Sequence, residues 1–328
     1  MTSETAKRDA GTGSLRSEGP KLPVKARIAI HGQPLPFLRD AILAGGGSVV
    51  DLREQPDGLV LDHRCDKQEL TRILDATPSI RWIQLPSAGI ESFSRPLAAY
   101  PDKIWTSAKG AYAKPVAEHA LALTLALLRG LPERSQARTW GEPAGTSLHG
   151  LSAVVIGAGG IGLEILRLFT AFDIKTDVVR RSTVTVAGAR QTTTADHLIE
   201  LLPKADIVVV AAALTNGTSK LIGEAELTAM KPSAVLINIA RGGLVDTDAL
   251  VSALATNRIY GAGLDVTDPE PLPEGHPLWD QPRALITPHT ADTLEMIRPL
   301  LAHRIETNVR LLAAGLPLEG LVNANAGY

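Results

Sequence analysis

Three short segments in the second half of the chain hold side chains suited to acid–base and anion-binding chemistry. NIARGG contains Arg241, GLDVTDPEPLP contains Glu270, and ITPHTAD contains His289. An arginine can hold a carboxylate through two parallel hydrogen bonds and polarise a neighbouring carbonyl oxygen. A histidine can give a proton to that oxygen, and a carboxylate beside the histidine orients its ring and favours its protonated form. Together the three residue types suit the reduction of a 2-keto acid, although each alone is more often a surface group.

A glycine-rich turn, GAGGIG, precedes these segments. Gly157, Gly159 and Gly162 have the spacing GxGxxG, with Gly160 and Ile161 between them, after the apolar run SAVVI and before IGLEILRLF. In dinucleotide-binding folds these glycines allow a tight turn, a close approach of the backbone to a pyrophosphate, and helix–strand packing. Free N–H groups at the helix N-terminus then bind phosphate. A structural turn and a methyltransferase loop are the alternatives, and the flanking strand and helix favour the dinucleotide.

The next predicted strand, TDVVRRS, bears on the choice between NAD and NADP. An NAD site usually has an acidic residue at the end of this strand, which binds the ribose 2′-OH. Here the strand ends in Arg180, Arg181 and Ser182, and Asp177 lies inside it. Guanidinium and hydroxyl groups suit the 2′-phosphate of NADP, and a solvated surface pair is the alternative. We therefore expect NADP as the cofactor, with NAD possible.

Two sets of elements must position these residues. Apolar strands alternate with amphipathic helices from residue 26 and again from Leu151, a pattern typical of parallel sheets covered on both faces. The sequence predicts an α/β fold of two doubly wound parallel-sheet domains, a Rossmann nucleotide-binding domain and a flavodoxin-like substrate domain. We expect a disordered tail over 1–25, a substrate domain over 26–115 and 291–328, and a dinucleotide-binding domain over 116–290. Ligands of such sheets bind at the carboxyl ends of the strands, where all three chemical segments lie.

A strongly apolar helix is predicted from Pro115, with the sequence PVAEHALALTLALLRGL. It is apolar on nearly all sides, so it should be buried between domains or subunits. This predicts a homodimer, with hinges between the domains near Lys114–Ala117 and Ala291–Leu294.

The composition of the chain limits the kinds of binding partner and the compartment that we expect. The formal net charge of -2 argues against nucleic acid and anionic membrane as partners, and the longest apolar run, Ala120 to Leu128, is too short to span a bilayer. The single cysteine, Cys65, suits a reducing cytoplasm, and the scattered histidines predict no metal site.

The order of the motifs resembles the D-isomer-specific 2-hydroxyacid dehydrogenase family, which includes phosphoglycerate dehydrogenase and glyoxylate/hydroxypyruvate reductase. The resemblance runs from about Trp82 to the end and includes LPSAGIES, TSAKGAYAKPVAEHALALTLAL and LTNGTSKLIG. It departs from the family at Arg180, where an acid is usual, at Ala213, where proline is common, and in TADT after His289.

The resemblance implies a role for each matching position. Arg241 would bind substrate, His289 would be the acid/base, and Glu270 would be its partner. The backbone of Ser87, Ala88 and Gly89 would hold the substrate carboxylate, and Thr218, Ala240 and Asp265 would touch the cofactor.

The leading hypothesis is an NADP-preferring reductase of glyoxylate, hydroxypyruvate or a similar short 2-keto acid. A phosphoglycerate or formate dehydrogenase is an alternative within the same family. A dinucleotide-sensing corepressor, like the C-terminal binding proteins, is an alternative from another class.

Overall fold

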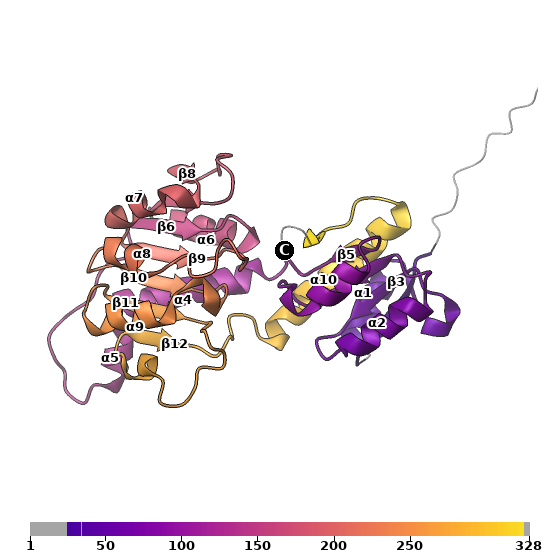
Figure 1. Cartoon of the computed structure of the whole chain (residues 1–328), viewed down its shortest axis with the longest axis horizontal. Coiled ribbons are helices and arrows are strands. Elements are labelled where there is room, and N and C mark those ends of the chain that lie inside the picture. The colour runs from indigo at the N-terminus through magenta and orange to yellow at the C-terminus, as the bar shows by residue number, and fades with distance from the viewer. Residues whose placement is uncertain (1–24, 34, 325–328) are drawn as a thin grey trace, which may run out of the picture.

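The computed structural model describes residues 25–33 and 35–324, which form two lobes joined at a narrow waist (Figure 1). The predicted tail lies outside the described residues except for Lys25. Each lobe is built on one fully parallel sheet with helices on its faces, so the predicted fold class is confirmed.

The first lobe holds a five-stranded sheet of order β2-β1-β3-β4-β5. Its strands are β1 (Arg27–His31), β2 (Ser48–Val49), β3 (Gly58–Leu61), β4 (Trp82–Gln84) and β5 (Ile104–Thr106). Its helices are α1 (Pro36–Ala44), α2 (Lys67–Ala76) and α3 (Ser94–Ala99). Strand β3 is buried along its whole length, as expected for a strand covered by helices on both faces.

The last helix, α10 (Leu294–Ala314), returns to this first lobe and lies against α1 (Figure 1). Its buried apolar residues Ile297, Leu301 and Ile305 recur every fourth position and so form one stripe along the helix. The side chain of Asn308 donates to Gln84 Oε1 at 3.0 Å, inside the core. The first lobe is therefore made of two pieces of chain that are distant in sequence.

The second lobe holds a seven-stranded sheet of order β12-β11-β10-β9-β6-β7-β8. Its strands are β6 (Ser152–Ile156), β7 (Lys175–Val179), β8 (Gln191–Thr193), β9 (Ile207–Val210), β10 (Val235–Asn238), β11 (Gly261–Leu264) and β12 (Ala284–Ile286). Its helices include α6 (Gly160–Thr170), α7 (Leu198–Leu201), α8 (Glu224–Ala229) and α9 (Thr247–Ala255). The edge strand β8 is short and polar, which is why the apolar pattern did not predict it.

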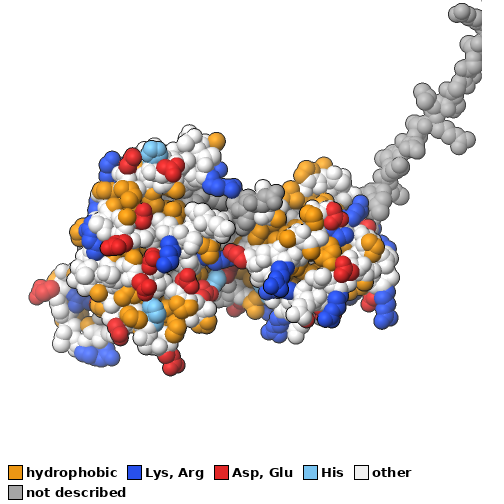
Figure 2. Space-filling model, in the orientation of Figure 1, with side chains coloured by type: hydrophobic (Ala, Val, Ile, Leu, Met, Phe, Trp, Pro, Cys, Tyr) orange, Lys and Arg blue, Asp and Glu red, His pale blue; other side chains and the backbone are white. Residues whose placement is uncertain are grey.

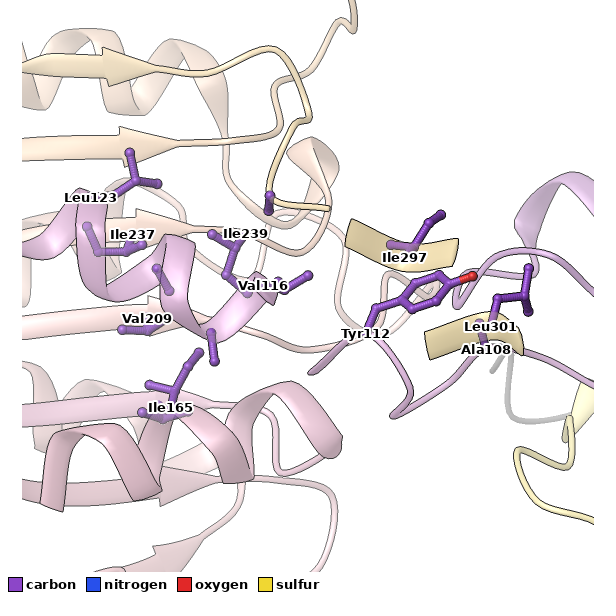
Figure 3. Packing of buried hydrophobic residues seen from close by; sticks show 14 of the residues in the cluster. Ala108, Tyr112, Val116, Leu123, Ile165, Val209, Ile237, Ile239, Ile297 and Leu301 are labelled. Atoms are coloured by element: carbon purple, nitrogen blue, oxygen red, sulfur yellow. The ribbon is translucent and has the colours of Figure 1, made fainter. Parts of the chain in front are cut away.

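Helix α4 (Ala113–Leu128) connects the lobes and is followed by the short α5 (Leu131–Gln136). It begins at Ala113 rather than at Pro115, which therefore lies inside the first helical turn, where proline is tolerated. Figure 3 shows buried side chains continuing from Ile237 on the seven-stranded sheet, through Val116 on α4, to Tyr112 and to Leu301 on α10. One apolar core thus runs through the waist and holds both lobes against the same helix.

The surface mixes charges of both signs over the two lobes on the face drawn in Figure 2. No helix within residues 25–33 and 35–324 is long and apolar enough to cross a membrane. In the same part of the chain, no group of three or more His, Cys, Asp or Glu side chains could hold a metal ion.

Candidate active site

Two of the predicted catalytic residues and one predicted cofactor contact follow three neighbouring strands at their carboxyl ends. Arg241 follows β10, Asp265 comes directly after β11, and His289 follows β12. These strands are adjacent in the sheet, so loops separated by many residues in sequence meet at one edge.

His289 and Glu270 form a close pair at this edge. The Nδ1 atom of His289 lies 2.7 Å from Oε1 of Glu270, and both side chains are about half exposed. A carboxylate on Nδ1 holds the ring in one orientation and leaves Nε2 as the nitrogen that can exchange a proton with a ligand. His289 also has a φ of 49°, in the left-handed region that residues with side chains rarely adopt.

Asp265 holds the loop that carries His289. Its carboxylate accepts from Thr287 Oγ1 at 2.6 Å, from Thr290 N at 2.9 Å and from Ala291 N at 3.1 Å. Its backbone oxygen accepts from the N–H of His289 at 2.8 Å. Asp265 is buried, and burial raises its pKa, but the hydrogen bonds to its carboxylate outweigh burial and hold the pKa below the usual value.

His119 joins the same network from the linker helix α4. Its Nε2 lies 2.9 Å from Thr287 Oγ1 and 3.4 Å from an oxygen of Asp265. The Thr287 hydroxyl donates to Asp265, so its oxygen accepts from His119 and Nε2 of His119 carries the proton. The two chain crossings between the lobes, α4 and the segment after β12, are therefore tied together beside His289.

Arg241 reaches across to the first lobe. Its Nε donates to Glu91 Oε1 at 3.0 Å and its Nη2 to Glu91 Oε2 at 3.4 Å. Its remaining nitrogen, Nη1, donates to the backbone oxygen of Ala240 at 2.7 Å, and Ala240 N in turn donates to Asn238 Oδ1 at 3.1 Å.

The loop after β4 contacts this arginine through Gly89. A Cβ atom at Gly89 would collide with Nη2 of Arg241, so a larger residue at this position would have to push the Arg241 side chain aside. Ser87 Oγ donates to the oxygen of Gly89 at 2.7 Å, and the oxygen of Ser87 accepts from Ala108 N at 2.9 Å. The structure thus brings the predicted Ser87–Ala88–Gly89 segment to Arg241.

The glycine turn has the shape that a dinucleotide requires. Gly157 has a φ of 108°, and a Cβ there would lie 2.5 Å from the oxygen of Ala211. A Cβ at Gly162 would collide with the oxygen of Gly157, whereas nothing lies within 4 Å of the Cβ position of Gly159. Helix α6 starts at Gly160, directly beside this open position, and Ile161 follows in its first turn. The open backbone and the helix N-terminus fit a pyrophosphate.

The end of β7 carries the predicted cations. The strand stops at Val179, Arg180 is partly exposed, and Arg181 is exposed. Burial lowers the pKa of Lys109, from the first lobe, and the positive charge of Arg181 lowers it further, so the two cations lie near one another.

Asp177, the acid within this strand, faces the interior. It is buried at 1% exposure and forms a two-bond ion pair with Arg190, whose Nε lies 2.8 Å from Asp177 Oδ1. Its carboxylate is therefore engaged away from the strand end.

The side chain of Thr218 forms hydrogen bonds to the backbone of the loop that follows β9. Its hydroxyl donates to the oxygen of Ala213 at 2.7 Å and accepts from Thr215 N at 2.8 Å. Thr218 and Ala240 both follow sheet strands at the same edge as the glycine turn.

The family model described as the D-isomer specific 2-hydroxyacid dehydrogenase, NAD binding domain, matches residues 121–291, about half of the chain. The chain belongs to the D-isomer specific 2-hydroxyacid dehydrogenase family. The resemblance seen in the motifs is confirmed, and so is the assignment as an NAD(P)-dependent oxidoreductase that passes a hydride between the dinucleotide and a 2-hydroxy or 2-keto acid.

Some relatives of this dehydrogenase are named as reductases of glyoxylate or hydroxypyruvate, and others as D-3-phosphoglycerate dehydrogenases. It is 35% identical to the glyoxylate reductase of Thermofilum pendens, over 76% of this chain and 77% of that one. It is 34% identical to glyoxylate/hydroxypyruvate reductase B of Pectobacterium carotovorum, over 76% of this chain and 81% of that one. The fold is that of a Xanthobacter autotrophicus family member solved with NADPH and MES, with a TM-score of 0.80, 24% identity, and 93% of this chain and 100% of that one covered.

Three residues at the site of this dehydrogenase had no role predicted from the sequence: Glu91, although it lies in LPSAGIES, Thr287 and His119. The only sequence feature that pointed to His119 was its position in PVAEHA, within the first two turns of the linker helix. Glu91 carried none beyond its position two residues after Gly89.

Proposed function

We propose that this dehydrogenase is a homodimeric, NADP(H)-preferring reductase of glyoxylate, hydroxypyruvate or a similar short 2-keto acid. One observation carries the cofactor preference: β7 ends in Arg180, Arg181 and Ser182, while Asp177 is paired inside the fold with Arg190. The names of the glyoxylate and hydroxypyruvate reductases to which the chain is similar support the substrate class.

The charge at the end of β7 favours the phosphorylated dinucleotide. A carboxylate there would bind the ribose 2′-OH of NAD and would repel a 2′-phosphate. Arg180 and Arg181 instead offer charge-assisted hydrogen bonds to that phosphate, and Ser182 offers a hydroxyl donor. Asp177 cannot replace the missing acid without leaving its buried position and breaking its ion pair with Arg190.

The chain's own residues then have distinct tasks in reduction. When bound, the nicotinamide supplies the hydride. Arg241 and the backbone of Ser87–Gly89 hold the substrate carboxylate and draw charge onto the carbonyl oxygen. His289 gives a proton from Nε2 to that oxygen, and Glu270 keeps the ring aligned through Nδ1 while the proton leaves.

The homodimer rests on exposed apolar groups around α5. Trp140 is 97% exposed and Leu131 53% exposed, next to the apolar helix α4. Exposed apolar surface of this kind is typical of protein–protein interfaces. Cys65 is buried and unpaired, which suits a reducing compartment, so we propose a cytoplasmic location, with dinucleotide and keto acid rather than nucleic acid as partners.

The test is a panel of keto acids assayed at 340 nm with NADPH and with NADH. We expect NADPH to have the higher kcat/KM, and Arg180→Ala and Arg181→Ala to reduce it mainly through KM for NADPH. Loss of one charge-assisted bond should cost about 1.5–3 kcal/mol, roughly tenfold or more. Arg310→Ala, on the surface of α10, is the matched control and should change nothing. Equal use of NADH by the wild type would refute the phosphate site.

A further inference from the structure

Glu91 occupies the part of Arg241 that a substrate carboxylate would use. A guanidinium binds a carboxylate with two parallel bonds along one edge, and Glu91 takes the edge formed by Nε and Nη2. Nη1 also donates to the oxygen of Ala240, so the edge formed by Nε and Nη2 is the one that pairs with a carboxylate in this structure. The chain therefore places its own carboxylate where the substrate's carboxylate belongs.

The space around this contact is small. A Cβ at Gly89 would lie 2.5 Å from Oε2 of Glu91 and would collide with Nη2 of Arg241. A ligand carboxylate and Glu91 cannot both lie along the same edge of Arg241 beside the backbone of Gly89. A substrate carboxylate that binds along this edge must therefore displace Glu91.

After displacement, Glu91 stays close to the bound ligand. Glu91 is the first residue of the short helix η2 (Glu91–Phe93). The last residue of this helix, Phe93, is buried in the core of the first lobe. The backbone position of Glu91 is therefore fixed, and only its side chain, 46% exposed, can turn aside. The negative charge remains within reach of the substrate's far end.

A second acidic residue, Asp292, lies near the same two side chains. Asp292 follows Ala291, whose N–H is held by Asp265 in the His289 loop. Burial raises the pKa of Asp292, and the charges of both His289 and Arg241 act on it, so it lies near both of them. Asp292 is thus a second acidic side chain near Arg241 and His289.

We propose that Glu91 is a specificity-determining residue, which admits 2-keto acids with a single negative charge and excludes those with a second carboxylate or a phosphate. This inference rests on the proposed reduction of 2-keto acids at Arg241 and His289. Glu91 acts twice: it competes with the substrate carboxylate for Arg241, and once displaced it repels a second anionic group. Rejection by like charge is a common way in which sites discriminate between similar ligands.

The test is Glu91→Gln, with Glu306→Gln as the matched control, since Glu306 is also bonded to an arginine, Arg310, but on the surface of α10. The substrates are glyoxylate and hydroxypyruvate, each with one charge, and oxaloacetate and phosphohydroxypyruvate, with more. Glu91→Gln should lower KM for glyoxylate about fivefold with kcat nearly unchanged, as expected for loss of a half-exposed ion pair. The ratio of kcat/KM for oxaloacetate to kcat/KM for glyoxylate should also rise, by up to about tenfold, because the second charge of oxaloacetate is no longer repelled.

A binding measurement accompanies the kinetics. Oxamate, an unreactive analogue with one carboxylate, should bind Glu91→Gln about fivefold more tightly than wild type in calorimetry. An unchanged KM, oxamate affinity and substrate preference in Glu91→Gln would overturn the proposal. A higher KM for glyoxylate would also overturn it, because Glu91 would then be positioning Arg241 rather than competing for it. If wild type reduces no keto acid with either cofactor, the proposed function fails, whereas the oxamate titration still decides whether Glu91 competes.

Discussion

Asp265→Asn removes one negative charge from the network under His289 and keeps the size of the side chain. Three donors bond to the wild-type carboxylate, Thr287 Oγ1, Thr290 N and Ala291 N at 2.6, 2.9 and 3.1 Å, and Nε2 of His119 lies 3.4 Å from it. An asparagine offers one oxygen to these donors and turns its own NH₂ toward the others. At least one buried donor is then left facing another donor.

The magnitude follows from these contacts. A hydrogen bond to a charged group contributes about 1.5–3 kcal/mol, against about 1 for a neutral one, and a buried unsatisfied donor costs about 1–3 kcal/mol. We therefore expect Asp265→Asn to lower the free energy of unfolding by about 2–4 kcal/mol. Because the Asp265 carboxylate holds the backbone of Thr290 and Ala291, directly after His289, a displacement of His289 by about 1 Å should reduce kcat about 10²-fold.

The effect depends on pH in a defined direction. Burial raises the pKa of Asp265, but the bonds from His119, Thr287, Thr290 and Ala291 hold it below its usual value in the folded state. The ionised carboxylate therefore stabilises the fold above the unfolded pKa of about 3.9, and this stability is lost as the pH falls through the lower folded pKa. The difference in unfolding free energy between wild type and Asp265→Asn should accordingly shrink in acid.

Urea unfolding, kcat at saturating NADPH and a direct titration of NADPH binding check this prediction. The matched control is Asp206→Asn at the amino ends of the strands, where Asp206 accepts from Ser152 N at 2.9 Å and Lys231 Nζ at 2.7 Å. It should lose stability and keep kcat. If Asp265→Asn weakens only NADPH binding and keeps its kcat, Asp265 does not hold the His289 loop and the reasoning is wrong.

Three further predictions concern turnover, substrate binding and assembly. His289→Ala should reduce kcat by about 10²–10⁴-fold with NADPH affinity intact, the usual scale for a proton donor, and near-normal turnover would exclude that role. Glu270→Gln should cost less, because an amide oxygen still accepts from Nδ1. Gly89→Ala should raise KM for glyoxylate, since its Cβ collides with Nη2 of Arg241, and steady-state kinetics would show an unchanged KM if that contact were irrelevant. Light scattering should give a dimer at micromolar concentration and Trp140→Ser should weaken it; a monomeric wild type would contradict the proposed assembly.

Local patterns were enough to predict the two parallel sheets and to place several candidate site residues at the carboxyl ends of their strands. A buried strand, a glycine turn and a helix start are neighbours in sequence, so GAGGIG, Arg180 and Arg181 could be placed at the sheet edge without any long-range information. The same holds for Arg241 and His289, because each follows an apolar strand directly and parallel strands end at one edge.

Tertiary structure alone decided which of these residues have partners and from where. Glu91 and Arg241 are 150 residues apart, and His119 meets Thr287 across 168. Asp177 is unavailable to a cofactor because the chain brings Arg190 back to it through the polar strand β8, which has too little apolar alternation to be predicted. Periodicity reports which side of an element is buried and where the element ends. Which charged groups meet across a domain boundary depends on how the two lobes close on one helix, and no local pattern contains that information.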